Sequence, residues 1–140
     1  MKQYYRFMTM LCLLMLCSCA TIRNSNSRDS FEKSMKGYNK MLRWQEVENA
    51  GMQYFDPKER DAFMKTAASI RKRGVSITDY RILTSECLPE KGTAESMVEF
   101  DYYTLPSNRV RSLTYTQKWI FIDTDEKKGW QVNSTLPAFD

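Results

Sequence analysis

The hydrophobic period of the chain changes at Gly74, and this change divides the sequence into a helical part and a stranded part. Before Gly74, apolar residues recur at intervals of three and four, and after it they alternate with polar residues. Helices followed by a run of sequential strands are typical of an α+β domain, in which helices pack on one face of an antiparallel sheet.

The first part of the domain is expected to hold three helices. The first begins at residue 31, after a cap at Asp29 or Ser30, and buries one face made of Phe31, Met35, Tyr38 and Leu42. The second is predicted over residues 44–53. The third begins at Pro57 with Asp56 as its N-cap and ends at Gly74, since proline suits the first helical position and glycine the position after the last turn.

The second part is expected to form four strands over residues 75–88, 94–103, 110–123 and 130–136, the last of them stopped by Pro137. In the first strand the alternation changes phase between Ile77 and Tyr80, which indicates a β-bulge near Thr78 and Asp79. The sequence therefore predicts N-terminal helices packed on a curved four-stranded antiparallel sheet.

A short apolar segment near the N-terminus, residues 7–16, follows the basic residues Lys2 and Arg6. A membrane-spanning helix needs roughly 20 apolar residues to cross the hydrocarbon layer, so this segment is too short to span. A basic start, a short apolar run and small residues after it are typical of a signal peptide.

The apolar segment ends in Leu16, Cys17, Ser18 and Cys19, which resembles the lipobox of bacterial lipoproteins. The resemblance implies cleavage between Ser18 and Cys19 and attachment of diacylglycerol and a fatty acyl chain, such as palmitate, to Cys19. Cys17 occupies a position that usually holds Ala, Ser or Thr. Several acyl chains anchor a protein stably, whereas one chain binds a membrane only marginally. Because Ala20 and not Asp follows Cys19, the resemblance implies the outer membrane, at its periplasmic face.

Three segments follow from these patterns. Residues 1–18 are expected to be the signal peptide, and residues 19–29 the lipidated N-terminus with a polar tether that has no hydrophobic period. Residues 30–140 are expected to form the α+β domain.

Composition excludes several kinds of chemistry. The chain has no histidine, so it has no Ser-His-Asp triad, no Cys-His dyad and no imidazole zinc site. Lys and Arg number 21 against 17 Asp and Glu, and removal of Lys2 and Arg6 lowers this excess to a value too small to predict nucleic-acid binding. Cys87 would be the only unmodified cysteine. We therefore expect no catalytic residue, no metal and no cofactor.

The domain also resembles the NTF2-like (cystatin-like) fold over residues 30–136. The resemblance depends on Leu42-Arg43-Trp44 opening a helix, Asp56-Pro57 before the third helix, Gln117-Lys118-Trp119 in the long strand and Gly129-Trp130-Gln131-Val132 in the last strand. It implies a cavity between the helices and the concave face of the sheet.

Residues that would line this cavity form the candidate pocket: Tyr80, Tyr102, Tyr115, Gln117 and Trp119. Gln117 is the only amide in an apolar stripe, and a buried amide without a partner costs about 1–3 kcal/mol. Two interpretations are open: Gln117 donates to a ligand, or it makes a structural hydrogen bond, as most buried amides do.

Three functions are consistent with these features. The first is a non-catalytic binding or scaffold domain, anchored to the membrane by its lipid, with an envelope protein as partner. The second is an isomerase or dehydratase, with Asp79 as base and Tyr80, Tyr102 and Tyr115 as donors. The third is a lipid or peptidoglycan binder.

Overall fold

The computed structural model describes residues 2–140, with side chains from Arg23 onward. Three helices come first: α1 (Lys2–Arg43), α2 (Val47–Tyr54) and α3 (Pro57–Lys72). The 3-10 turn η1 (Pro89–Lys91) separates the first two of four strands, which are β1 (Val75–Leu88), β2 (Thr93–Thr104), β3 (Ser107–Asp123) and β4 (Lys128–Val132).

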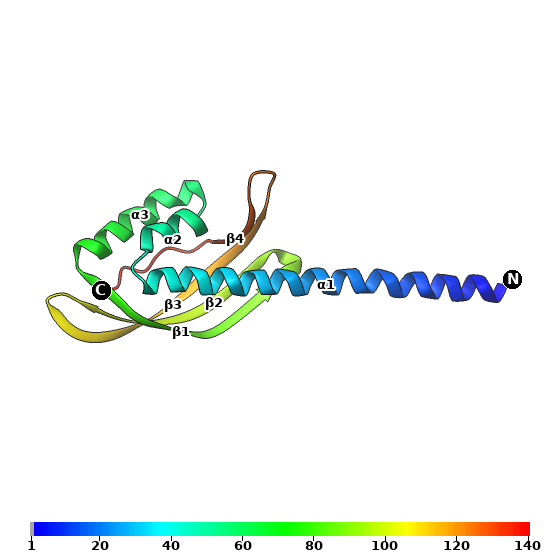
Figure 1. Cartoon of the computed structure of the whole chain (residues 1–140), viewed down its shortest axis with the longest axis horizontal. Coiled ribbons are helices and arrows are strands. Elements are labelled where there is room, and N and C mark those ends of the chain that lie inside the picture. Colours follow the sequence, from blue (N-terminus) through cyan, green and yellow to red (C-terminus); the bar gives the residue numbers. More distant parts are fainter. Residues whose placement is uncertain (1) are drawn as a thin grey trace.

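The strands form one antiparallel sheet in the order β1-β2-β3-β4, and the helices cover its concave side (Figure 1). The N-terminal half of α1 extends well beyond the sheet. The predicted α+β class, with helices on a curved four-stranded antiparallel sheet, is therefore confirmed.

The local signals for α3 are confirmed. The Asp56 carboxylate accepts a hydrogen bond from the backbone N–H of Lys58 at 2.8 Å, and Pro57 occupies the first turn. Gly74 follows the helix with φ of +66°, and a Cβ there would meet the Leu105 side chain at 3.1 Å. Glycine is thus required both for the backbone conformation and for the approach of the β2–β3 turn.

The start of α1 differs from the prediction. Phe31 does not open a helix, because residues 23–30 already belong to α1. The indole N–H of Trp130 contacts the Ser27 carbonyl oxygen at 3.2 Å and the Ser30 hydroxyl oxygen at 3.1 Å. Residues 23–29, which the sequence predicted as part of a polar tether, are thus helical, and Trp130 of β4 contacts this part of the helix. The boundary between tether and domain stays a prediction.

The second helix begins later than predicted. Leu42 and Arg43 close α1 and do not open a helix, and α2 starts only at Val47. Gln45 between them has φ of +63°, which no helix accommodates, and Trp44 in the same turn is 63% exposed. Residues 44–46 form a tight turn, but the sequence predicted a helix over them because the turn contains no glycine or proline.

The sheet is close to its prediction, although β3 begins at Ser107 and not at residue 110, and β4 begins at Lys128 and not at residue 130. β1 has the predicted bounds and the predicted bulge between Ile77 and Asp79, but a second bulge follows between Ile82 and Thr84. β4 ends at Val132 and not at residue 136. After Val132 the N–H of Asn133 donates to the carbonyl oxygen of Lys118, the Ser134 hydroxyl accepts from the N–H of Lys118, and the chain then leaves the sheet.

The core lies between the helices and the concave face of the sheet. The predicted apolar face of α1 is buried throughout, and so is the predicted inward face of β2. From β2 this face contributes Ala94, Ser96, Val98, Phe100 and Tyr102. Residues 133–140 also contribute to the core, through Leu136 and Phe139.

Candidate functional site

The five residues of the candidate pocket come from neighbouring strands. Tyr102, Gln117 and Trp119 are buried, while Tyr80 and Tyr115 are partly buried. Each of them contacts other core groups, so the question for each side chain is whether its polar atoms are available to a ligand.

Gln117 is bonded to the chain itself. Its amide N–H donates to Asn39 Oδ1 at 2.6 Å, and its Oε1 accepts from Asn39 Nδ2 at 3.2 Å and from the Ser96 hydroxyl at 3.1 Å. Asn39 Nδ2 also donates to the carbonyl oxygen of Met35. This reciprocal amide pair and the Ser96 hydroxyl join α1 to β2 and β3. All hydrogen bonds of Gln117 given above are made within the chain, in agreement with its structural interpretation.

Asn39 was missed by sequence reasoning, although it is completely buried. The signal was its position four residues after Met35 on α1, at the edge of the apolar stripe. A polar residue at that position is usually exposed, and only the opposite strand shows that it has a partner.

Trp119 lies at the centre of the aromatic core. Its ring makes edge-to-face contacts with Phe31, Tyr38 and Tyr54 at centroid distances of 5.8, 5.7 and 6.1 Å. Its indole N–H has no hydrogen-bond partner among the described residues. The side chain is therefore a packing residue in this arrangement.

Tyr115 and Tyr38 place two phenols in the same region of the core. The Tyr115 hydroxyl is 3.0 Å from the Ser134 hydroxyl. The Tyr38 hydroxyl is completely buried, and among the described residues no well-formed hydrogen bond satisfies it. Burial raises the pKa of Tyr38 well above its ordinary value, and Tyr115 adds to this shift. Burial also raises the pKa of Tyr115, so both phenols are neutral at pH 7.

Tyr102 and Tyr80 both pack against residues of the core. The Tyr102 hydroxyl donates to the carbonyl oxygen of Asp140 at 2.6 Å. The Tyr80 ring lies 6.3 Å from that of Phe100. The space beside Phe100 and Tyr102 is filled by the ring of Phe139, so the C-terminal segment occupies this part of the concave face.

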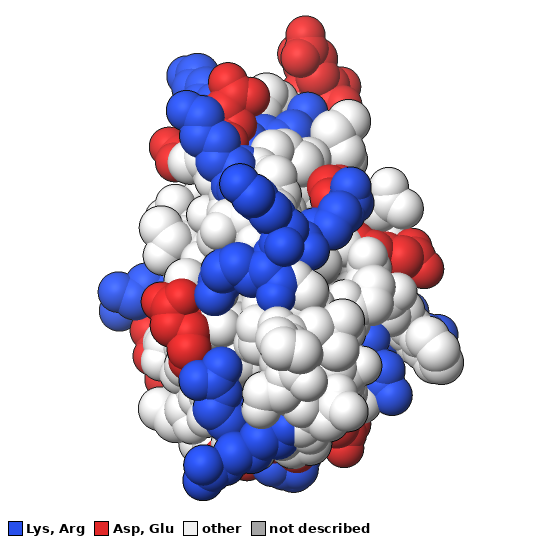
Figure 2. All heavy atoms as spheres, turned by 90° about the vertical axis from the view of Figure 1, so that its left-hand side faces the viewer, with Lys and Arg blue, Asp and Glu red and all other residues white. Residues whose placement is uncertain are grey.

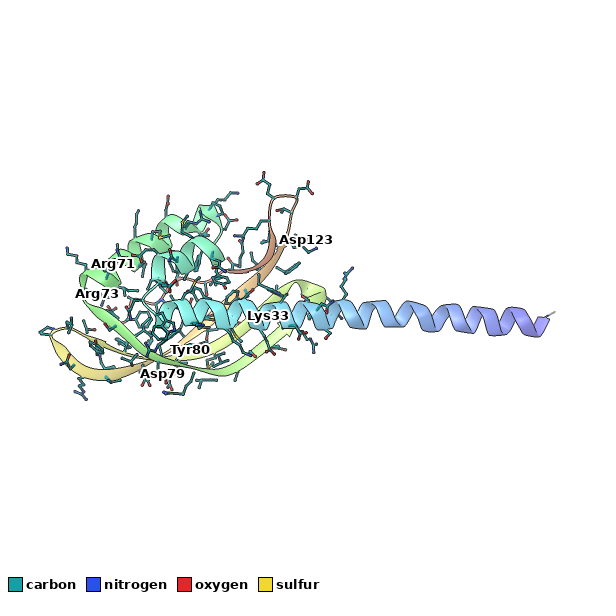
Figure 3. All side chains as sticks on the ribbon, viewed as in Figure 1. Lys33, Arg71, Arg73, Asp79, Tyr80 and Asp123 are labelled. Atoms are coloured by element: carbon teal, nitrogen blue, oxygen red, sulfur yellow. The ribbon has the colours of Figure 1, made fainter. Side chains whose placement is uncertain are left out.

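Asp79 was the candidate base, and it is exposed in the β1 bulge (Figure 3). Its Oδ1 accepts from the backbone N–H of Tyr80 at 2.9 Å, which is a local turn contact. Asp79 does not face a closed cavity, and a solvated carboxylate at this position is not arranged to remove a proton from a ligand between helices and sheet.

Three hollows of the described surface lie away from the candidate pocket. One of about 150 Å³ separates α3 from the segment after β4 and is lined by Phe55, Phe63, Ser134 and Leu136, among others. A second of about 330 Å³ lies between α1 and the end of β1, beside Cys87. A third of about 240 Å³ lies where α2, α3, the start of β1 and Leu105 meet. The five candidate residues line none of them.

The predicted lipidation site lies outside the part of the chain whose side chains are described. Ser18 and Cys19 fall within α1, and nothing further follows about their side chains. Within the described part, no helix is both long and apolar enough to cross a membrane. The same residues include no group of three His, Cys, Asp or Glu side chains that would hold a metal ion.

The element order and sheet topology define an α+β domain with helices on a curved antiparallel sheet. Comparisons with known proteins found solved structures of similar fold, two of which are described below. No protein family profile and no curated protein sequence matches the chain. The intermembrane space region of the chloroplast protein ARC6 is 12% identical; the match covers 77% of this chain and 92% of that one, with a TM-score of 0.48. An NTF2-like protein with a cystatin-like fold from Novosphingobium aromaticivorans is 14% identical over 81% of this chain and 82% of that one, with a TM-score of 0.49.

Proposed function

We propose that this chain is a lipid-anchored, non-catalytic domain of the bacterial cell envelope, which binds or positions a partner at the periplasmic face of the outer membrane. The observation that carries the proposal is the sequence Leu16-Cys17-Ser18-Cys19, placed ahead of a domain in which the buried Gln117 bonds to Asn39 and Ser96 of the same chain.

The interior supports a binding role over a catalytic one. Gln117 and Tyr102 are occupied by contacts within the chain, and Tyr115 contacts Ser134. The isomerase or dehydratase alternative needs a carboxylate base beside neutral tyrosines, and Asp79 is exposed in the bulge.

The end of the domain farthest from the N-terminus of α1 offers a surface to a partner. Trp44 and Leu105 are 63% and 56% exposed there, and the guanidinium of Arg43 lies over the Trp44 ring at 5.3 Å. Lys and Arg side chains cross this end of the molecule (Figure 2), and Arg71 lines the hollow beside Leu105. Exposed aromatic and arginine side chains are enriched in protein interfaces.

Metabolic labelling with a palmitate analogue tests the anchor. The parent chain and a Cys17→Ser control are expected to carry the label, and a Cys19→Ser variant is expected to lose it and accumulate as precursor. Label that persists in Cys19→Ser, or that disappears in Cys17→Ser, would contradict the assignment of Cys19.

Affinity purification of the tagged, lipidated protein from detergent-solubilised envelopes of its own host tests the binding role. We expect a stoichiometric protein partner whose recovery falls with Trp44→Ala and not with Met52→Ala, a control of similar exposure on α2. A retained small molecule that is chemically converted would instead support the enzyme, and retained lipid or glycan fragments alone would support the third function.

A further inference from the structure

Residues 133–140 follow the last strand and return to the core without regular structure of their own. Leu136 is 6% exposed and Phe139 only 1% exposed, although the last residue of β4 is Val132. Phe139 has φ of +57°, a left-handed conformation that is unfavourable for a phenylalanine. A bulky residue keeps such a backbone only where its surroundings hold it.

The Phe139 ring enters an aromatic recess on the inner face of β2. It makes edge-to-face contacts with Phe100 at 5.8 Å and Tyr102 at 5.2 Å between ring centroids, each at an interplanar angle of 75°. This is the favoured geometry of aromatic pairs. The recess therefore selects a flat aromatic side chain.

Two side chains around the recess bind the backbone of the same segment. The Arg73 guanidinium donates to the carbonyl oxygens of Ala138 and Phe139, the latter at 3.3 Å. It also donates to Asp140 Oδ1 at 3.0 Å, and the Tyr102 hydroxyl donates to the Asp140 carbonyl oxygen at 2.6 Å. Arg73 lies at the junction of α3 and β1, beside the C-terminus (Figures 1 and 3).

These contacts are made by side chains of the domain and not by a β-ladder. After the contact of Asn133, the segment has no backbone–backbone hydrogen bond to a strand among the described residues. The Asp140 side chain is 84% exposed, so its ion pair with Arg73 is solvated and weak. Residues 138–140 can therefore leave the recess while the sheet keeps all of its backbone pairs.

We propose that the recess of Phe100, Tyr102 and Arg73 is a peptide-binding site that the chain's own residues 138–140 occupy in cis. Its ligand in trans is a protein segment with an aromatic residue for the recess and backbone carbonyl groups for Arg73. An acidic residue after the aromatic one adds only a solvated, weak ion pair with Arg73. The segment limits access, so a partner must displace it. This inference deepens the proposed function by giving the chemistry of a partner, and it does not depend on the lipid anchor.

A binding measurement with the purified protein tests this site. The probe is a fluorescent peptide Ser-Thr-Leu-Pro-Ala-Phe-Asp, the sequence of residues 134–140, and its matched control carries Ala in place of Phe. A chain that stops after Leu136 should bind the probe at least about tenfold more tightly than the full chain, and should bind the Ala peptide at least about tenfold more weakly than the probe.

Arg73→Ala in the shortened chain should weaken binding by about tenfold or more, because the charged hydrogen bonds are lost. Lys72→Ala, an exposed neighbour with no contact to the segment, should leave binding unchanged. Equal losses in both variants would mean that the probe binds only through general charge, and would overturn the proposal.

A full-length Phe139→Ala variant keeps the test decisive if the shortened chain does not fold, since it empties the recess and retains the rest of the segment. We expect it to bind the probe more tightly than the parent chain. No gain in either variant would overturn the proposal. A dimer of the intact chain that disappears on shortening would also overturn it, because the segment would then be exchanged between copies and not held in cis. Failure of this test leaves the palmitate labelling and the affinity purification unaffected.

Discussion

Two regions of the concave face, around Gln117 and around Phe139, are filled in different ways. Around Gln117, buried amides of α1 and β3 bond to each other with no exposed atom. Around Phe139, an irregular segment is held by Arg73 and Tyr102 at the edge of the domain. The amides in the first region and the Tyr102 hydroxyl in the second all have partners within the chain, but we propose that only the second region opens without breaking a strand or a helix. Satisfied polar groups therefore do not by themselves distinguish a permanent core from a replaceable occupant.

Gln117→Leu, in the region of the buried amide pair, should cause the largest loss of stability. It leaves Asn39 Oδ1 and the Ser96 hydroxyl without their buried partner, so we expect the free energy of unfolding to fall by about 3 kcal/mol. Urea denaturation measures this loss, and Thr114→Val on the exposed side of the same strand should change stability by less than about 0.5 kcal/mol.

The double variant Asn39→Leu with Gln117→Leu sharpens the result. Replacing both partners by apolar groups removes the orphaned amide, so the double variant should be more stable than the sum of the single losses predicts, by at least about 1 kcal/mol. Strict additivity would show that the two amides do not depend on each other.

Phe139→Ala should lower the free energy of unfolding by less than the burial of the Phe139 ring suggests. A core Phe→Ala change costs roughly 3–5 kcal/mol, but the loss here is limited to the energy that holds the segment in its recess, and we expect about 2 kcal/mol. Hydrogen exchange checks the comparison: the backbone N–H groups of residues 138–140 should exchange through openings of lower free energy than the backbone N–H of Asn39 in the parent chain. Equal protection would mean that the segment is as permanent as the amide pair.

Tyr38→Phe should give the smallest effect at neutral pH, a gain of up to about 1 kcal/mol, because it removes a buried hydroxyl without a well-formed hydrogen bond. Tyr115→Phe, which removes the contact with Ser134, should instead destabilise by about 1 kcal/mol.

Tyr38→Phe also changes how the free energy of unfolding depends on pH in the alkaline range. Burial raises the pKa of Tyr38 in the folded chain, so the unfolded chain loses this proton first. The contribution of Tyr38 to the free energy of unfolding is fully present below the ordinary tyrosine pKa of about 10 and is lost as pH rises above it. Denaturation curves from pH 8 to 11 should therefore fall less steeply for Tyr38→Phe than for the parent chain, and parallel curves would contradict this assignment.

Local signals predicted the parts of the molecule that depend on neighbours in sequence. The Asp56 cap, the terminator Gly74 and the bulge after Ile77 all lie where the sequence indicated them. In the candidate site, the inward positions of Tyr102, Gln117 and Trp119 were predicted by alternation, and their burial is confirmed.

The remaining features depend on residues far apart in the chain. Asn39 and Gln117 are 78 positions apart, and Arg73 and Phe139 are 66 apart, so no local pattern shows either pair. Pro137 was expected to stop the last strand, but β4 already ends at Val132, and nothing near Pro137 indicates that Phe139 returns to the core. The continuation of α1 before Phe31 likewise depends on Trp130, about a hundred residues later.

The contact of Trp130 with Ser27 and Ser30 has a mechanical consequence for an anchored protein. If α1 is continuous from Cys19 to Ser30, this stretch spans only about 17 Å, at 1.5 Å of rise per residue, against about 35 Å for an extended tether. The helix then forms a short, rigid spacer between Cys19 and the domain, and the contact with Trp130 fixes it to the domain. Under the proposed lipid anchor, the Trp44 end of the domain would lie away from Cys19 at a nearly constant distance, because the helix is fixed to the domain.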